Sequence, residues 1–411
     1  MISMIEAINL PAENPRVMRG YALIAQGNKP IPLADGKYEI PSQSGNGNYT
    51  VTKKGDKWDC GCPDHFYHGV ECKHIHAVRY YLQVEKETAK GTETTKIPLT
   101  HSQAWTAYNE AQTNEVRLFD ELLKDLVQNI EEPNQHMGRP RLSLRETAFC
   151  SIQKVYSQLS SRRARSLFKN AEEREQINHT PHFNAISKML LREEMTPILQ
   201  DLIRLSAIPL AGIETDFAVD STGFTCSGFG AYCIEKHNNK RHHNWVKAHI
   251  CSGVKTNIVT DVVITDGNSA DSPQFDGLIR RTSMGFDINE VSADKAYSSR
   301  ANYNTVEEVG GQAYIPFRKN ATARSKSSPL WKKAYHHFQL YRDEFDTHYH
   351  KRSNAESTIG AIKKKFGETL KSKKWIAQKN ELLCKILAYN ITVLIHEMFE
   401  SGITPDFLTS K

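Results

Sequence analysis

The sequence predicts a chain of three parts, of which the largest is an α/β domain with a mixed sheet flanked by helices. Three observations lead to this division. Cysteine and histidine crowd into residues 60–74, apolar side chains have helical spacing over residues 102–205, and the spacing changes to a period of two from residue 213. At about 150 residues per domain, a chain of 411 residues is expected to hold two or three such units.

The first part is predicted to be a small ββα domain. Two strand-like runs, 37–40 and 49–52, are joined by a Ser/Gly/Asn turn, and residues 74–82 have helical spacing. Four candidate metal ligands follow the hairpin, the last of them at the start of the helix: Cys60, Cys62, Cys72 and His74. Three thiolates and one imidazole in two tight pairs predict one closed, structural Zn²⁺ site. Free cytosolic thiols are the alternative.

The second part is predicted to be a helical module. One long helix is expected over residues 102–130, and a cluster of short helices follows, the first of them over 144–159. Ser160 is expected to cap the next helix, and Thr180-Pro181 and Thr196-Pro197 each look like an N-cap followed by proline at the first helical position. Such a cluster fits a helix-turn-helix that binds DNA. A packed helical connector is the alternative.

The third part alternates strands and helices. Strands are predicted at 216–220, 245–250, 260–264, 288–293 and 312–316, with helices over 272–284 and 302–309 and a helical last hundred residues. The most apolar stretch, 382–399, is interrupted by four polar residues, so we expect a buried or amphipathic helix and no membrane span. The predicted domains are 1–85, 86–205 and 206–400, with a tail at 401–411.

Positive charge is concentrated in two segments. The whole chain has a net charge of +6, but residues 318–379 hold 16 basic and 5 acidic residues, a net of +11, and residues 139–169 hold 8 basic residues and one acid, a net of +7. Two basic islands in an otherwise slightly acidic chain predict contact with a polyanion. Solvated helix faces are the alternative.

Two carboxylates follow apolar strands. Asp220 and Asp294 each stand where a predicted strand ends, so their side chains are expected to project together at one edge of a sheet. Carboxylates grouped in this way are ligands for Mg²⁺. Five nearby acids could equally cap turns: Glu214, Asp216, Asp261, Asp266 and Asp271.

A third carboxylate has support from helical spacing. Tyr349, Arg352, Glu356 and Lys363 fall at relative positions 0, 3, 7 and 14, which places them within an arc of about 60° on a helix. Apolar residues at 359, 362, 366 and 370 occupy the adjoining sector and can anchor this helix to the sheet. A carboxylate flanked by a phenol and two cations suits phosphodiester chemistry.

These motifs resemble those of DDE insertion-sequence transposases. The spacing Tyr-x2-Arg-x3-Glu-x6-Lys is similar to their YREK signature, and AspSerThrGly and AlaAspLysAlaTyr are similar to their first and second acidic motifs. The similarity spans residues 205–400 and implies an RNase H-like fold. The Cys/His pattern resembles a SWIM zinc finger, which is not part of the usual catalytic core. Only 61 residues separate Asp294 from Glu356, too few for the large β-rich insertion that some relatives carry, which argues against a hairpin-forming excision route that depends on such an insertion.

The resemblance implies a metal-dependent DNA transposase. Asp220, Asp294 and Glu356 would be catalytic and would hold two Mg²⁺, or Mn²⁺, ions about 4 Å apart. Tyr349, Arg352 and Lys363 would contact the transposon end. Five arginines of the helical module would contact DNA backbone: Arg139, Arg141, Arg162, Arg163 and Arg165.

The implied partners are double-stranded DNA, as terminal inverted repeats and target, and a second copy of the chain in a synaptic homodimer. The implied location is the prokaryotic cytoplasm, in association with the nucleoid when the protein is bound. Two other functions remain open. One is a non-enzymatic DNA-binding protein derived from a transposase, and the other is a nuclease that cuts without joining.

Overall fold

The computed structural model describes residues 15–25, 28–33, 36–42, 47–55, 57–88, 104–134, 137–138, 141–226, 245–324 and 328–407. The chain divides into two compact units at the boundary between residues 103 and 104.

The first unit contains a four-stranded antiparallel sheet in the order β1-β2-β3-β4, and helix α3 packs against it. Its elements are α1 (Pro15–Ala25), β1 (Ile31–Pro32), β2 (Lys37–Pro41), β3 (Asn48–Lys54), β4 (Lys57–Cys60), α2 (Pro63–His68) and α3 (Lys73–Thr88). The predicted hairpin and helix are confirmed as β2, β3 and α3, but the sequence did not predict α1, β1, β4 or α2. Helix α1 lies on α3 at Gly20, where a Cβ atom would come within 2.8 Å of the Lys73 carbonyl oxygen.

The second unit begins with the predicted helices, α4 (Trp105–Val127), α5 (Leu144–Ser157), α6 (Ser161–Glu173), α7 (Phe183–Met189) and α8 (Met195–Ala207), the last continued by η1 (Ile208–Leu210). Two predicted caps are wrong, because His182 caps α7 and Glu194 precedes α8. Both threonine hydroxyls are engaged elsewhere: Thr180 donates to Glu172, and Thr196 Oγ1 donates to Asn380 Oδ1 at 2.7 Å. Ser160 does stand at the N-cap of α6, although its side chain makes no capping bond.

A five-stranded mixed sheet follows, in the order β7-β6-β5-β8-β9. The strands are β5 (Asp216–Thr225), β6 (Trp245–Gly253), β7 (Val259–Asp266), β8 (Glu290–Ala293) and β9 (Gln312–Tyr314). Neighbouring strands among β5, β6 and β7 pair antiparallel, whereas β8 pairs parallel with β5 and β9 parallel with β8. This order and these directions make the sheet RNase H-like, as predicted.

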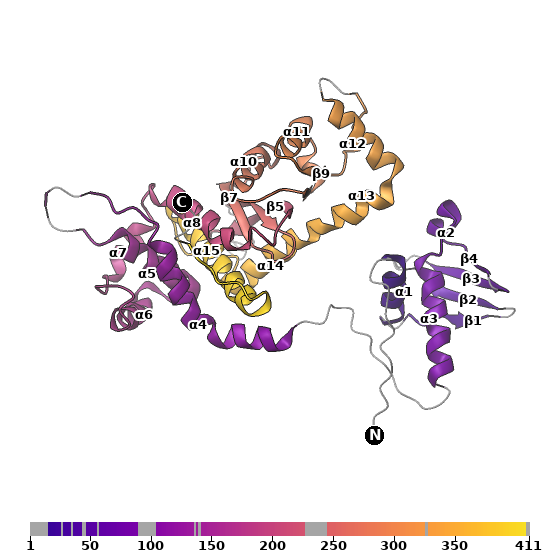
Figure 1. Cartoon of the computed structure of the whole chain (residues 1–411), viewed down its shortest axis with the longest axis horizontal. Helices are drawn as coiled ribbons and strands as arrows, with labels where there is room; N and C mark the ends of the chain where they lie inside the picture. The colour runs from indigo at the N-terminus through magenta and orange to yellow at the C-terminus, as the bar shows by residue number, and fades with distance from the viewer. Residues whose placement is uncertain are drawn as a thin grey trace, which may run out of the picture. The chain divides into compact units, whose positions relative to one another are not determined.

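Helices cover both faces of this sheet. Helices α10 (Ser272–Thr282) and α11 (Arg300–Glu308) lie on one side, and α14 (Ser353–Phe366) lies against β5 and β6 on the other (Figure 1). The remaining elements between β8 and α14 are η2 (Lys295–Tyr297), α12 (Pro329–Leu340), α13 (Arg342–Tyr349) and η3 (His350–Arg352). The helix expected to carry Tyr349 to Lys363 is therefore divided by a 3₁₀ turn.

The last helix, α15 (Trp375–Glu400), is the core of the second unit. It packs against α4, α5 and α8 of the helical module and contacts β7 and α14. By length and hydropathy it could cross a membrane, but 83% of its most apolar window is buried inside the protein. The helix lies between the helical module and the sheet, and the polar residues that interrupt its apolar sequence can contact both.

Candidate active site and metal centre

Asp220 lies in the middle of β5, where β8 ends beside it. The sequence places a strand end at Asp220, but β5 continues to Thr225, paired with β6. The parallel pairing with β8 stops at Val219, which lies opposite Ala293. Asp294 is the next residue after β8, and its charge acts on the Asp220 carboxyl.

Asp294 is held at the start of a 3₁₀ turn. Its Oδ1 accepts a hydrogen bond from the backbone N–H of Lys295 at 2.6 Å. The turn is braced by Arg318, whose Nη2 donates to the Ala296 carbonyl oxygen at 2.8 Å. Sequence reasoning missed this bracing role, since nothing in the spacing of Arg318 connects it with residues 295–296.

Glu356 lies in the first turn of α14, and its side chain is 56% exposed. The apolar side of α14 is buried at Ile359, Ile362 and Phe366, and Leu370 is buried just beyond the helix, as the spacing predicts. This anchoring fixes α14 along β5 and β6. Glu356 is thereby presented on the same side of the sheet as Asp220.

Arg352 joins two of the acids. Its Nη1 donates to Asp220 Oδ2 at 3.3 Å, and its Nη2 donates to Glu356 Oε1 at 2.5 Å. The guanidinium carbon also lies 6.0 Å from the centre of the Tyr349 ring. One cation thus stands between carboxylates that belong to β5 and α14.

The acids are close enough to influence one another. Burial raises the pKa of Asp220, and the negative charges of Glu356 and Asp294 raise it further, while the Ser221 N–H and Arg352 act against the rise. Burial also raises the pKa of Tyr349. The charge of Arg352 lowers this pKa, and the charges of Asp294 and Glu356 raise it. Five of the predicted site residues are therefore brought together: Tyr349, Arg352, Asp220, Asp294 and Glu356.

The three carboxylates suit a hard cation by chemistry, because each offers oxygen atoms and they come from three separate elements. Their oxygens are nevertheless not gathered tightly. Across the part of the chain that the structure describes, only two groups have ligand atoms that all lie within 4.8 Å of one another, and the three acids are not among them. Arg352 occupies a position between Asp220 and Glu356 instead.

Lys363 lies further along α14, with its Nζ 5.3 Å from the centre of the Phe224 ring. It stands seven positions after Glu356 on the helix, which corresponds to about 10 Å. Phe224 is likewise four residues beyond Asp220 on β5. Lys363 therefore provides a positive charge beside the carboxylate cluster and outside it.

The five other acids near the site have structural partners. Glu214 and Asp266 accept hydrogen bonds from turn N–H groups, whereas Asp216, Asp261 and Asp271 form ion pairs. Asp261, for example, is 1% exposed and lies between Arg204 and Arg281. Turn capping is the role that the sequence left open for all five, whereas the ion pairs were not predicted.

The arginines of the helical module lie mainly on α6. Arg162, Arg163 and Arg165 are exposed, while Ala164, Phe168 and Ala171 form the buried side of the same helix. Arg141 is exposed just before α5, and Arg139 lies outside the described residues. A three-residue link, 158–160, connects α5 to α6, as in a helix-turn-helix.

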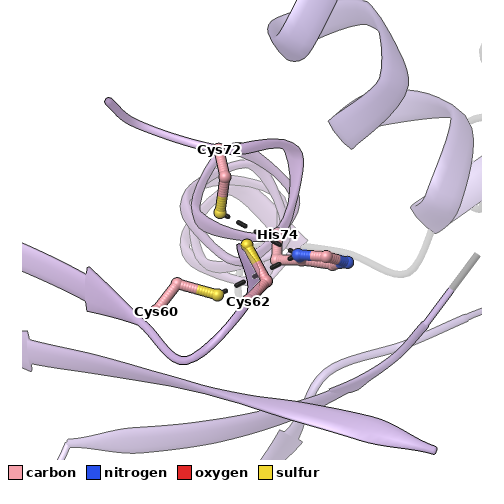
Figure 2. Close-up of side chains that lie close together, drawn as sticks. All are labelled: Cys60, Cys62, Cys72 and His74. Atoms are coloured by element: carbon pink, nitrogen blue, oxygen red, sulfur yellow. Dashed lines mark hydrogen bonds between the residues drawn. The ribbon is translucent and has the colours of Figure 1, made fainter. Parts of the chain in front are cut away.

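The first unit gathers four metal-ligand side chains (Figure 2). Cys60 ends β4, Cys62 caps α2, and Cys72 and His74 stand at the start of α3. The sulfurs of Cys60 and Cys72 each lie 3.9 Å from His74 Nδ1. All four ligand atoms lie within 4.8 Å of one another, and all four residues are buried.

This arrangement fits a tetrahedral ion. Zn–S and Zn–N bonds of about 2.3 and 2.05 Å require sulfur and nitrogen to be about 3.6 Å apart, close to the distances observed. A hydrogen bond shared with Cys60 lowers the pKa of Cys72, and burial opposes this effect. One thiolate is thus favoured even before a metal binds.

No solved structure matches the chain. Residues 212–391, which contain the RNase H-like sheet and all three carboxylates, match the family model of the transposase DDE domain, and this match supports a DDE transposase.

Proposed function

We propose that this protein is a metal-dependent DNA transposase that cleaves the ends of its element and joins the freed 3′ hydroxyl to target DNA. One observation carries the proposal. Within the segment that matches the transposase DDE domain, Asp220, Asp294 and Glu356 approach one another around Arg352. Grouped carboxylates can hold the metal ions that assist attack on a phosphodiester, and an arginine beside them can bind its phosphate.

Asp220, Asp294 and Glu356 would hold the catalytic cations, two Mg²⁺ or Mn²⁺ ions. When bound, these ions supply activation of the attacking water or 3′ hydroxyl and stabilisation of the leaving oxygen. The half-buried position of Asp220 and the bracing of the turn after Asp294 by Arg318 support the proposal, because both restrict these carboxylates before a substrate arrives. Exposure of Glu356 leaves the site open to DNA.

The cationic residues would bind DNA phosphates. Arg352 and Tyr349 lie beside the carboxylates, so they would contact the strand close to the cleaved bond. Lys363, about 10 Å along α14 from Glu356, would hold the strand beyond it. Residues 86–205 would form the module that recognises the terminal repeat, through the exposed arginines of α6 and through Arg141 and Arg139.

Cys60, Cys62, Cys72 and His74 would hold one structural Zn²⁺ ion in a SWIM-like domain that ends near residue 85. The nearly complete burial of the four ligands supports a closed site, with no position for a substrate. The catalytic domain would span residues 206–400, before a tail at 401–411. The protein would act as a homodimer that holds the two ends of the element, both of them double-stranded DNA. It would do so in the cytoplasm of a prokaryote.

The test is a transposition reaction with purified protein. A labelled duplex carrying the inverted repeat that flanks the gene is incubated with a target plasmid and Mg²⁺. We expect cut and joined products from the native chain and neither from Asp220→Asn. Asp266→Asn is the matched control, because that carboxylate only caps a turn at the end of β7, and it should retain both products.

The alternatives give different products. Binding of the repeat by the native chain with no cleavage would mean a DNA-binding protein that has kept the fold. Cleavage with no joined product would mean a nuclease. Cleavage by Asp220→Asn at the native rate would mean that the carboxylate cluster takes no part in catalysis.

A further inference from the structure

Arg352 forms contacts that compete with the ions proposed for the same site. Its guanidinium spans Asp220 Oδ2 at 3.3 Å and Glu356 Oε1 at 2.5 Å. The other oxygen of Asp220 accepts the Ser221 N–H at 2.9 Å. Both oxygens of Asp220 are therefore engaged by the protein itself, and one of them by a positive charge.

The guanidinium lies between two of three carboxylates that do not form a compact oxygen cluster. Within the described residues, no group of close ligand atoms combines the three acids. An arginine between two carboxylates neutralises part of their charge, as a metal ion would, but it also occupies the space between them. A divalent ion that takes oxygens from Asp220 and Glu356 must therefore displace it.

The neighbouring cations have other contacts. Lys351 Nζ donates to Asp216 at 2.6 Å and to Glu290 at 2.8 Å, which ties it to the starts of β5 and β8. Lys363 lies over Phe224. Among the described contacts of these three cations, only those of Arg352 reach Asp220 and Glu356.

We propose that Arg352 is an exchangeable counter-ion that couples cation binding to DNA binding at this site. Without a divalent ion it is held by Asp220 and Glu356. When an ion takes those oxygens, the guanidinium is released to form a bidentate contact with a DNA phosphate beside the carboxylates. The inference rests on the proposed function, since it assumes that these acids hold the ions and that DNA lies against them.

Coupling of this kind is reciprocal. A divalent ion should strengthen DNA binding, and DNA should strengthen ion binding by the same factor, roughly tenfold within the usual range for coupled sites. Removal of the guanidinium should have two opposite effects. The ion should bind more tightly in the absence of DNA, and DNA binding should lose its dependence on the ion.

The test measures binding with the full chain loaded with zinc. Mn²⁺ affinity without DNA is followed by electron paramagnetic resonance. Affinity for a fluorescein-labelled duplex of the flanking repeat is followed by anisotropy, with Ca²⁺ or with K⁺ at equal ionic strength. We expect Arg352→Gln to bind Mn²⁺ several-fold more tightly than the native chain and to bind the duplex equally in both salts. Arg352→Lys should be intermediate, because it keeps the charge and loses the fork.

Lys363→Gln is the matched control, since it removes a cation of α14 that contacts no carboxylate of the site. It should weaken duplex binding by the same factor in both salts and leave Mn²⁺ affinity unchanged. Weaker Mn²⁺ binding by Arg352→Gln, or a retained Ca²⁺ effect on its DNA affinity, would overturn the proposal. If Asp220→Asn instead binds Mn²⁺ as the native chain does, the proposed metal site fails, and that result is distinct from failure of the coupling.

Discussion

The side-chain amide of Asn390 pairs with the backbone of Val259 through both of its polar atoms. Its Oδ1 accepts the Val259 N–H at 3.0 Å, and its Nδ2 donates to the Val259 carbonyl at 2.7 Å. Val259 begins β7, an outer strand of the five-stranded sheet. The amide of a helix residue therefore takes the place of a neighbouring strand at the edge of the sheet.

Replacement of Asn390 by alanine should destabilise the second unit. The change leaves one buried donor and one buried acceptor without partners, and the free energy of unfolding should fall by about 3 kcal/mol. Urea unfolding followed by tryptophan fluorescence measures the loss. Thr392→Ala is the control, because its hydroxyl bonds only within the helix, to the Tyr389 carbonyl; a loss as large as that of Asn390→Ala would contradict this account.

The polar residues of α15 show how far the sequence could lead. Its apolar stretch correctly predicts a buried helix, and the alternation of strands and helices correctly predicts the sheet. The partner of Asn390 lies far away in the sequence. Lys385 donates to the carbonyls of Gly367 and Thr369, which lie in a turn with no regular period. Local spacing indicates which residues interrupt an apolar face, but only packing decides what they bind.

His249 should make stability depend on pH. Burial lowers its pKa to about 4, from an ordinary value of 6.5, and the Asp271 carboxylate acts in the opposite direction. Between these values the unfolded chain binds a proton that the folded chain does not. The free energy of unfolding should therefore fall as the pH drops from about 6.5 to 4, by about 3 kcal/mol.

The measurement is urea unfolding at a series of pH values for the native chain and for His249→Gln. Other groups contribute below pH 5, so the difference between the two curves is the quantity of interest. The variant should lack most of the slope between pH 6.5 and 5. Parallel curves would show that His249 does not remain neutral in the folded protein.

Removal of zinc should unfold the first unit and leave the second intact. Among the described residues, the core cluster of the first unit contains nine buried apolar residues, three of them the cysteines of the metal site, so metal binding is expected to supply much of the folding free energy. Hydrogen exchange read by mass spectrometry should show a loss of protection confined to the elements of the first unit, from α1 to α3, after chelation. Cys72→Ser should have the same effect, and Cys226→Ser, at a partly exposed position in the second unit, should retain the metal.

The candidate sites were predictable to different extents. Cys60, Cys62, Cys72 and His74 lie close together in the sequence, so their spacing was sufficient to predict the cluster. Asp220, Asp294 and Glu356 could be recognised by motif, yet their mutual approach depends on the early end of β8. The contacts of Arg352 with two of these acids depend on how α14 packs on β5. The spacing of residues in the sequence does not predict that packing.

The arginines of α6 should govern how DNA binding depends on salt. Each phosphate contact adds about 0.9 to the slope of the logarithm of the binding constant against the logarithm of salt concentration, because it releases condensed counter-ions. Alanine at Arg162, Arg163 or Arg165 should each lower that slope by about 0.9, as measured by anisotropy over a range of KCl concentrations. Arg117→Ala is the control, since this exposed arginine of α4 is paired with Glu121 and should leave the slope unchanged. Equal slopes for the α6 variants and the control would mean that α6 is a packed connector and that the DNA lies elsewhere.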